Sequence, residues 1–176
     1  MNEVLVEKAI IDLLVALGED INREGLRETP KRVSRMYKEI LSYPEYNNTT
    51  FMSKYDDIVM VRDIEFVSMC EHHLLPFYGI CHIAYIPNGN IIGLSKIARI
   101  VEKYSKKLQV QERLTLDILN ELKSVLNTQD IAIYIEAKHM CMISRGVRKE
   151  LSNTVTTKLS GVFKDKRKND FYCLIK

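Results

Sequence analysis

Apolar residues near the start of the chain recur with the period of an amphipathic helix. Between Ile10 and Leu17 they occupy positions i, i+3, i+4 and i+7, so that one helix face is apolar. Gly18 follows directly and suits the left-handed residue that ends many helices. The pattern predicts a first helix that ends at this glycine.

A second apolar stripe runs from Val33 to Ile40. Thr29 is expected to accept a hydrogen bond from a free backbone N–H at the start of this helix. Pro30 suits the first helical position, where its missing N–H costs nothing. Together the two stripes predict an N-terminal helical hairpin, which we assign to residues 1–42.

The remaining residues, 43–176, alternate between strand-like and helix-like patterns. A Tyr-, Asn- and Thr-rich loop is expected first, and β-branched or alternating segments then predict strands at residues 58–67, 79–86, 131–141 and 147–157. The turn residues Pro87–Asn90 predict a hairpin into Ile91 and Ile92. Helical stripes follow Ser95 and Leu114, and a short basic helix is expected after Lys164.

Helices placed between hairpin-like strands, without repeated strand–helix–strand units, favour an α+β fold with an antiparallel sheet. The chain of 176 residues is long enough for one compact domain with a real core. Its net charge of +3 is too small to indicate nucleic-acid binding. The longest apolar run, residues 13–17, is too short for a membrane span, and no secretory signal precedes it. We therefore expect a cytoplasmic protein.

The residues with the clearest chemical potential are cysteines and histidines in two short segments. Cys70 and His73 are separated by two residues, a spacing that directs a thiolate and an imidazole at one ion. His139 and Cys141 stand two apart at the end of the most regular strand, and strand alternation predicts that they share one side. The three that lie outside these two segments, Cys81, His82 and Cys173, are interpreted as structural.

If the two segments meet, Cys70, His73 and Cys141 supply three ligands to Zn²⁺ and leave a fourth position open, as in catalytic zinc sites. His72 and His139 then neighbour the metal and are candidates for proton transfer. A zinc ion that only stabilises a non-catalytic domain is the alternative, and a fourth protein ligand would favour it.

Basic residues near these segments suggest an anionic substrate. Ser95 and Lys96 open a helix whose free N–H groups favour phosphate, and Arg99 lies one turn further on. Arg145 follows Cys141 closely. Such residues are often only solvated surface, and it is their nearness in sequence to the predicted ligands that favours phosphate binding.

Five long motifs resemble the GTP cyclohydrolase I family and cover roughly residues 5–165 in the same order. The motifs are Glu24–Arg32, Cys70–Phe77, Ile92–Lys96, Leu108–Thr115 and His139–Val147. The resemblance implies a tunnelling fold, in which helices pack on one face of an antiparallel sheet. It implies conversion of GTP to 7,8-dihydroneopterin triphosphate and formate, the first step towards tetrahydrofolate and other pterins.

The resemblance also assigns residue roles. Cys70, His73 and Cys141 would bind one Zn²⁺ per subunit. His139 would transfer protons at the purine and His72 would assist, while Ser95 would contact the ribose. The guanine pocket would consist of Glu112 with Gln111 and the backbone at Val110, and the triphosphate would be held by Lys96, Arg99 and Arg145.

The resemblance further implies a homodecamer of two pentamers, with active sites at subunit interfaces. GTP is the only partner expected besides other copies of the chain, with neither nucleic acid nor membrane. The alternative within the same fold is another enzyme acting on a purine or a pterin. One such branch, the nitrile reductases, uses a cysteine nucleophile, and no separate activated cysteine stands out in this sequence.

Overall fold

The computed structural model describes residues 1–176 and divides into two compact units, Met1–Ser42 and Tyr43–Lys176. None of its helices combines the length and the apolar character that a membrane crossing requires. We describe each unit by itself.

The first unit is a helical hairpin, as predicted, with one additional turn. It consists of α1 (Glu3–Ala16), the short α2 (Glu24–Arg27) and α3 (Thr29–Leu41). The Asn2 side chain caps α1 by accepting a hydrogen bond from the Leu5 N–H. The buried Ser34 of α3 donates to the carbonyl oxygen of Glu3 at 3.3 Å, which ties the two long helices together.

The prediction that Thr29 caps the second helix is wrong. Thr29 is already the first residue of α3, and Glu28 stands at the cap position. The Thr29 hydroxyl donates backwards to the carbonyl oxygen of Gly25 at 3.3 Å. The Thr29 side chain therefore bonds to the preceding turn, α2, and does not cap α3.

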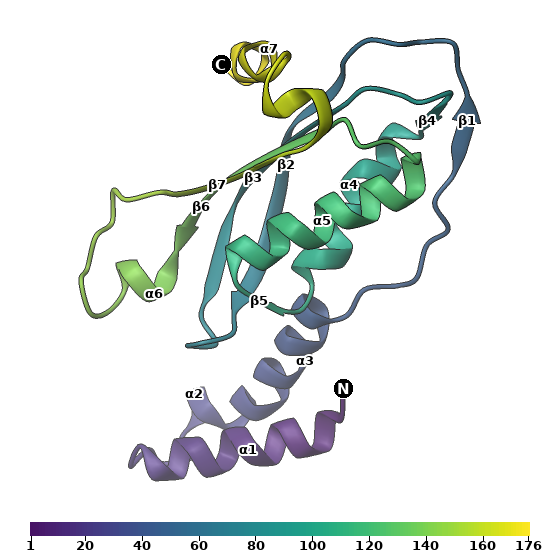
Figure 1. Ribbon diagram of the computed structural model, residues 1–176. Coiled ribbons are helices and arrows are strands. Elements are labelled where there is room, and N and C mark those ends of the chain that lie inside the picture. The colour runs from purple at the N-terminus through teal and green to yellow at the C-terminus, as the bar shows by residue number, and fades with distance from the viewer. The chain divides into compact units, whose positions relative to one another are not determined.

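The second unit is built on a five-stranded sheet with the order β5-β2-β3-β6-β7 (Figure 1). The strands β2, β3, β6 and β7 pair antiparallel, and β5 adds to β2 in parallel. Their bounds are Leu108–Gln109 for β5, Val59–Cys70 for β2, Pro76–Tyr85 for β3, Ile131–His139 for β6 and Thr154–Leu159 for β7.

A β-bulge explains why the alternating pattern of β2 is irregular. The pairing with β3 shifts between Val61 and Ile64, and Asp63 has a positive φ of 55°. Because of the extra residues, Val61 and Ile64 both face the main core although they are three positions apart. A strict period of two cannot represent this change of face.

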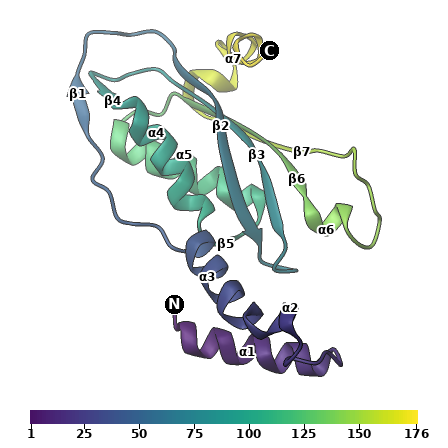
Figure 2. The same cartoon turned by 180° about the vertical axis from the view of Figure 1, so that it is seen from behind.

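Two helices, α4 (Leu94–Ser105) and α5 (Gln111–Leu126), cover one face of the sheet (Figures 1 and 2). The apolar stripes predicted for them are buried, among them Ile97, Ile100, Leu114 and Ile118. They pack against the same face of β6 that carries Ile131, Ile133 and Ile135. The predicted α+β class, with helices on one face of a mainly antiparallel sheet, is confirmed.

The opposite face of the sheet is covered at one end by the C-terminal segment. This segment contains the 3₁₀ turn η1 (Gly161–Lys164) and α7 (Lys168–Leu174). Phe163 and Phe171 are fully buried there against Ala84 and Ala132. The short helix expected after Lys164 is thus present, and one aromatic side chain anchors it to the sheet.

Several strand predictions need correction, among them the strand expected at residues 147–157, which is found at Thr154–Leu159 as β7. The hairpin expected at Pro87–Asn90 does not form, because β4 (Asn90–Ile92) pairs with β1 (Thr50–Met52) instead of β3. β1 lies inside the segment expected to be a loop. The most regular strand ends at His139, and Cys141 follows in a short helical turn, α6 (Met140–Ile143).

Close backbone contact between β3 and β6 depends on Gly79. This residue pairs with Ala137, and a Cβ atom at position 79 would lie only 2.7 Å from the Ala137 Cα and still closer to the carbonyl oxygen of Glu136. Only glycine therefore fits between these two strands. The pair Phe77 and His139 lies next to it in the same register.

Candidate functional site

The candidate site begins at a tight turn between β2 and β3. Cys70 ends β2, and its N–H donates to the carbonyl oxygen of Leu75 at 2.8 Å. The Leu74 N–H donates back to the Cys70 carbonyl at 2.9 Å, and Leu74 adopts a left-handed conformation with φ of 53°. A non-glycine residue held in this conformation stores strain of the kind found at functional sites.

The turn brings Cys70 and His73 next to Cys141. One ligand atom from each of the three residues lies within 4.8 Å of the others, and the Cys70 Sγ is 3.9 Å from the His73 Nδ1. Cys141 reaches this position from α6, directly after the strand that pairs with β3. The three predicted metal ligands are therefore together, although Cys141 does not continue the strand.

The donor set suits a zinc ion. Two sulfurs and one imidazole nitrogen are preferred zinc donors, and no fourth Cys, His, Asp or Glu belongs to the group. The pKa of the Cys141 thiol is raised, mainly by burial and to a smaller extent by the nearby Cys70. Two thiolates at this separation repel each other, and a divalent cation between them would offset that repulsion.

Arg145 and His72 lie on the solvent side of this group. The Arg145 Nη1 is 3.1 Å from the His73 Nε2, so the predicted phosphate ligand is adjacent to the predicted metal ligand. His72 is exposed, with its Nε2 3.9 Å from the Oε1 of Glu71. Both residues are therefore beside the group and accessible.

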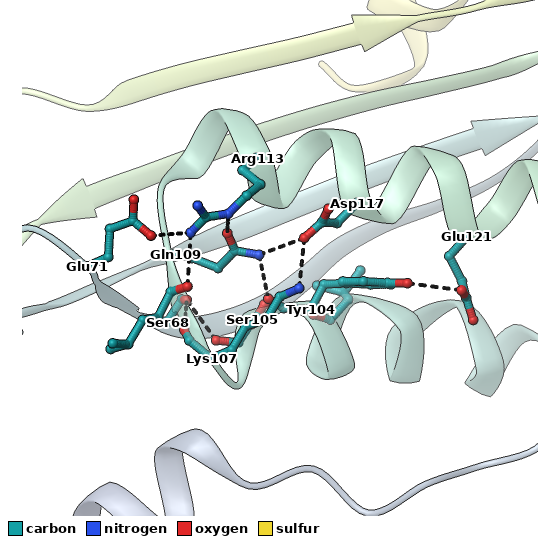
Figure 3. A network of polar contacts seen from close by, with 11 residues as sticks. Ser68, Glu71, Tyr104, Ser105, Lys107, Gln109, Arg113, Asp117 and Glu121 are labelled. Atoms are coloured by element: carbon teal, nitrogen blue, oxygen red, sulfur yellow. Dashed lines mark hydrogen bonds and ion pairs between the residues drawn. The ribbon is translucent and has the colours of Figure 1, made fainter.

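A polar network ties the turn to the start of α5 (Figure 3). Arg113 donates to the Glu71 carboxylate, to the carbonyl oxygen of Leu108 and, at 2.8 Å, to the Gln109 Oε1. Gln109 in turn donates to Asp117 at 3.0 Å. The hydrogen bond from Arg113 lowers the pKa of the Glu71 carboxyl, which stays ionised and keeps the contact.

His139 lies between the sheet and α5. Its ring stacks on Phe77 with the centroids 4.7 Å apart and the planes within 3°, and its Nε2 is 2.8 Å from the Gln111 Oε1. Burial lowers the pKa of His139, and the Glu112 carboxylate opposes that shift. This predicted proton-transfer residue thus has a fixed ring plane and a hydrogen-bond partner.

The residues predicted for the guanine pocket differ in exposure. Val110 stands at the N-cap of α5 and is partly exposed, and Glu112 in the first turn is exposed with its carboxylate free of ion pairs. The Gln111 side chain is buried, with 1% of its surface exposed. Its amide bonds to β6, β7 and His139.

Ser95, Lys96 and Arg99 do not join the Cys/His group within one chain. They lie on the first half of α4, which begins beside β4 (Figure 1). The other end of α4 is next to the group, since the Ser68 hydroxyl donates to the Ser105 carbonyl at 2.7 Å. At 1.5 Å per residue, Ser95 is about 15 Å further along the helix axis.

Arg99 lines a separate cleft of about 190 Å³, which is also lined by Tyr43, Tyr46 and Lys103. Its guanidinium lies 4.1 Å from the centroid of the Tyr46 ring, as expected for a cation–π contact. The Cys/His group and this cleft are therefore two distinct regions of the second unit.

Three contributors to the site escaped the sequence analysis: Phe77, Glu71 and Arg113. Phe77 stands directly opposite His139, and the strand register that pairs them has no signal in a single sequence. The sequence does, in contrast, indicate that the Gln111 side chain points inward. It precedes Leu114 and Ile118 by three and seven positions, on the stripe that α5 buries.

Two sequence comparisons with known proteins agree on one family. The sequence model of the family described as GTP cyclohydrolase I matches residues 6–176. A "GTP cyclohydrolase 1" of Sulfurihydrogenibium sp. is 52% identical over 174 residues, covering 97% of this chain and 93% of that protein. One from Clostridium perfringens is 52% identical over 170 residues, covering 93% of this chain and 92% of that protein.

A solved structure also matches, that of an archaeosine synthase QueF-like protein in the apo form. It is 17% identical and covers 60% of this chain and 96% of its own, with a TM-score of 0.47.

Proposed function

The chain belongs to the GTP cyclohydrolase I family, and from this premise we propose which of its residues perform the reaction. The protein converts GTP to 7,8-dihydroneopterin triphosphate, and its α+β architecture is the tunnelling fold of that family. The alternatives, a non-catalytic zinc domain and another enzyme of the same fold, do not agree with this membership. The observation that carries the residue assignment is the meeting of Cys70, His73 and Cys141.

Cys70, His73 and Cys141 would hold one zinc ion. A zinc ion with three protein ligands supplies Lewis acidity and an activated nucleophile near neutral pH. The protein would place this chemistry at C8 of the purine. The contacts of Glu71 with Arg113 would hold the turn that carries two of the ligands.

His139 would transfer protons at the purine ring, and His72 would assist from the exposed side. The stacking of His139 on Phe77 supports this role, because a fixed ring plane positions a nitrogen for proton transfer. Protonation at N7 makes C8 electrophilic, so that a water can add at C8 and open the imidazole ring of the substrate. A second water then hydrolyses the resulting formamide and releases formate. Ser95 would contact the ribose during the following rearrangement.

Glu112 would recognise guanine, since a carboxylate accepts hydrogen bonds from N1–H and the 2-amino group, which adenine does not offer together. The backbone at Val110 would line the same pocket. Lys96, Arg99 and Arg145 would hold the triphosphate through charge-assisted hydrogen bonds.

The separation of Ser95, Lys96 and Arg99 from the metal ligands supports a site shared between copies. A neighbouring subunit would bring the start of its α4 to the Cys/His group. We propose a homo-oligomer for this reason, and a decamer of two pentamers from the family resemblance. We also propose that the enzyme works in the cytoplasm, where thiols such as Cys70 and Cys141 stay reduced.

The deciding experiment incubates the zinc-loaded protein with GTP and measures formate together with the fluorescent pterin formed on oxidation. We expect both products in equal amounts, and none with ATP, because Glu112 selects guanine. The variant Glu112→Ala should bind GTP more weakly and keep its zinc. Unchanged affinity for GTP in this variant would remove Glu112 from the proposed pocket.

A further inference from the structure

The side chain of Gln111 crosses from α5 to the sheet, where its surroundings fix both ends of its amide. The Nε2 lies 3.2 Å from the Ile135 carbonyl oxygen, 3.0 Å from the Thr154 carbonyl oxygen and 3.1 Å from the Thr156 Oγ1. The Oε1 lies 2.8 Å from the His139 Nε2. Both polar ends of this buried side chain are therefore engaged within the protein.

The two backbone carbonyls determine which end of the amide is which. Carbonyl oxygens only accept hydrogen bonds, so the group facing Ile135 and Thr154 must be the NH₂ of Gln111. The reversed amide would place its oxygen against both carbonyls. The orientation of the amide thus follows from its partners.

The threonine hydroxyls agree with this orientation. Thr115 donates to the Gln111 backbone carbonyl at 2.8 Å, which uses its only hydroxyl proton. In the contact of 2.7 Å between Thr115 and Thr156, the proton must then come from Thr156. The Thr156 oxygen is left as an acceptor for Gln111, so every donor in the chain of contacts meets an acceptor.

The consequence for His139 is a defined tautomer. The Gln111 Oε1 can only accept, and therefore the His139 Nε2 must carry a proton. A neutral imidazole has one N–H, which leaves the lone pair on Nδ1. A ring flipped by 180° would still stack on Phe77, but it would place Cε1 against the Gln111 Oε1 and lose the contact of 2.8 Å.

We infer that Gln111 is a positioning residue whose Oε1 holds the His139 ring through its Nε2–H and leaves Nδ1 as the nitrogen available to the substrate. The inference rests on the proposed role of His139 in proton transfer. It replaces the expectation that the Gln111 side chain binds guanine, because no N–H of its amide is free to do so. Gln111 contributes through His139 and is not itself a catalytic residue.

The direct test is nuclear magnetic resonance of the zinc-loaded protein with ¹⁵N-labelled histidine. The chain has four histidines, and the spectrum of His139→Ala identifies the signals of this ring. We expect a protonated, pyrrole-type Nε2 and a bare, pyridine-type Nδ1 in the wild type. A proton on Nδ1 with a bare Nε2 would overturn the inference, whatever the activity.

The kinetic test uses Gln111→Met, which keeps the length of the side chain and removes the acceptor. We expect kcat to fall about 10²-fold, since loss of the correct tautomer removes part of the contribution of a general acid–base. KM for GTP and zinc content should stay unchanged. A raised KM with unchanged kcat would show instead that Gln111 binds the substrate, and no change in either would remove it from the mechanism.

A control separates this effect from a loss of stability. Ser160→Ala removes a buried hydroxyl that donates to the Gln129 and Ile131 carbonyls, away from His139. It should lower thermal stability and leave kcat unchanged. If Gln111→Met fails to fold, the wild-type spectrum still decides. Full turnover in His139→Ala would refute the proposed role of His139, and the spectrum would still report its tautomer.

Discussion

The two ends of α4 differ in how completely one chain builds them. Beside its last residue, the Cys/His group is assembled from two segments, with Arg113 bonded to the turn that carries Cys70 and His73, and with the neighbouring His139 held by Gln111 and Phe77. At its first turn, Ser95 is exposed and Lys96 makes no ion pair within the chain. One chain therefore brings the proposed metal ligands together completely and carries two of the proposed phosphate ligands at the other end of α4.

The largest effect is expected at the end of α4 that lies beside the Cys/His group. Cys141→Ala should lose zinc and lower turnover at least about 10³-fold, because Lewis acidity contributes several kcal/mol to such reactions. Metal analysis alongside formate release measures both. Cys173→Ala, which removes an exposed thiol outside the group, is the matched control. Retention of zinc and turnover in Cys141→Ala would disprove the assignment of this ligand.

The next test addresses the other end by combining two defective variants. Lys96→Ala and His139→Ala should each lower turnover at least about 10-fold, given the strength of charge-assisted bonds and of proton transfer. Co-expressed in equal amounts, they should recover about a quarter of wild-type activity if each site draws the two residues from different subunits. No recovery would mean that one chain supplies both.

A smaller effect is expected from the bracing of the ligand turn. Arg113→Met should weaken zinc affinity about 10-fold, as losses of residues that orient metal ligands commonly do. Chelator competition measures it. The control is Lys103→Met, which breaks a comparable ion pair with Glu121. Glu121 lies at the far end of the same network (Figure 3). Equal zinc affinity in both variants would show that the Glu71 contact is only a surface ion pair.

The smallest expected effect is on stability, and it arises away from both ends of α4, at the β-bulge of β2. Burial lowers the pKa of His82 from its usual 6.5, and its Nδ1 accepts a hydrogen bond from the Asp63 N–H. Below about pH 6.5 the unfolded chain therefore binds more protons at this residue, and the protein should lose stability as the pH falls.

Urea unfolding at several pH values, compared between the wild type and His82→Gln, isolates this contribution. The variant should show a weaker dependence on pH between about 6.5 and 5. An identical dependence in both proteins would mean that the neighbouring Asp63 and Glu136 carboxylates compensate for the burial of His82.

The Cys/His group was predictable because the chemistry of metal ligands restricts residue type and spacing. Cys70 and His73 lie in one turn, and the helical stripes beside them have a period that the sequence displays. Strand pairing has no such local signal, because the backbone N–H and C=O groups of β4 could form hydrogen bonds with either β3 or β1. The break between His139 and Cys141 was missed for a related reason, because alternation predicts a face and not where a strand ends.

Gln111 shows how the resemblance and the pattern can differ. The resemblance placed it against the substrate, while its position on the buried stripe of α5 directs it inward. A polar residue on an apolar stripe needs partners of its own, and those partners were visible only once β6 and β7 were in place.

The tight fit at Gly79 has a consequence for how this enzyme tolerates genetic change. Replacement by alanine, the mildest possible mutation, would push apart the two strands on which Phe77 and His139 face each other. Such a variant could retain every reactive group and still misalign them. Screens for inactive alleles should therefore recover this position, which has no side chain of its own, as well as the residues that perform the chemistry.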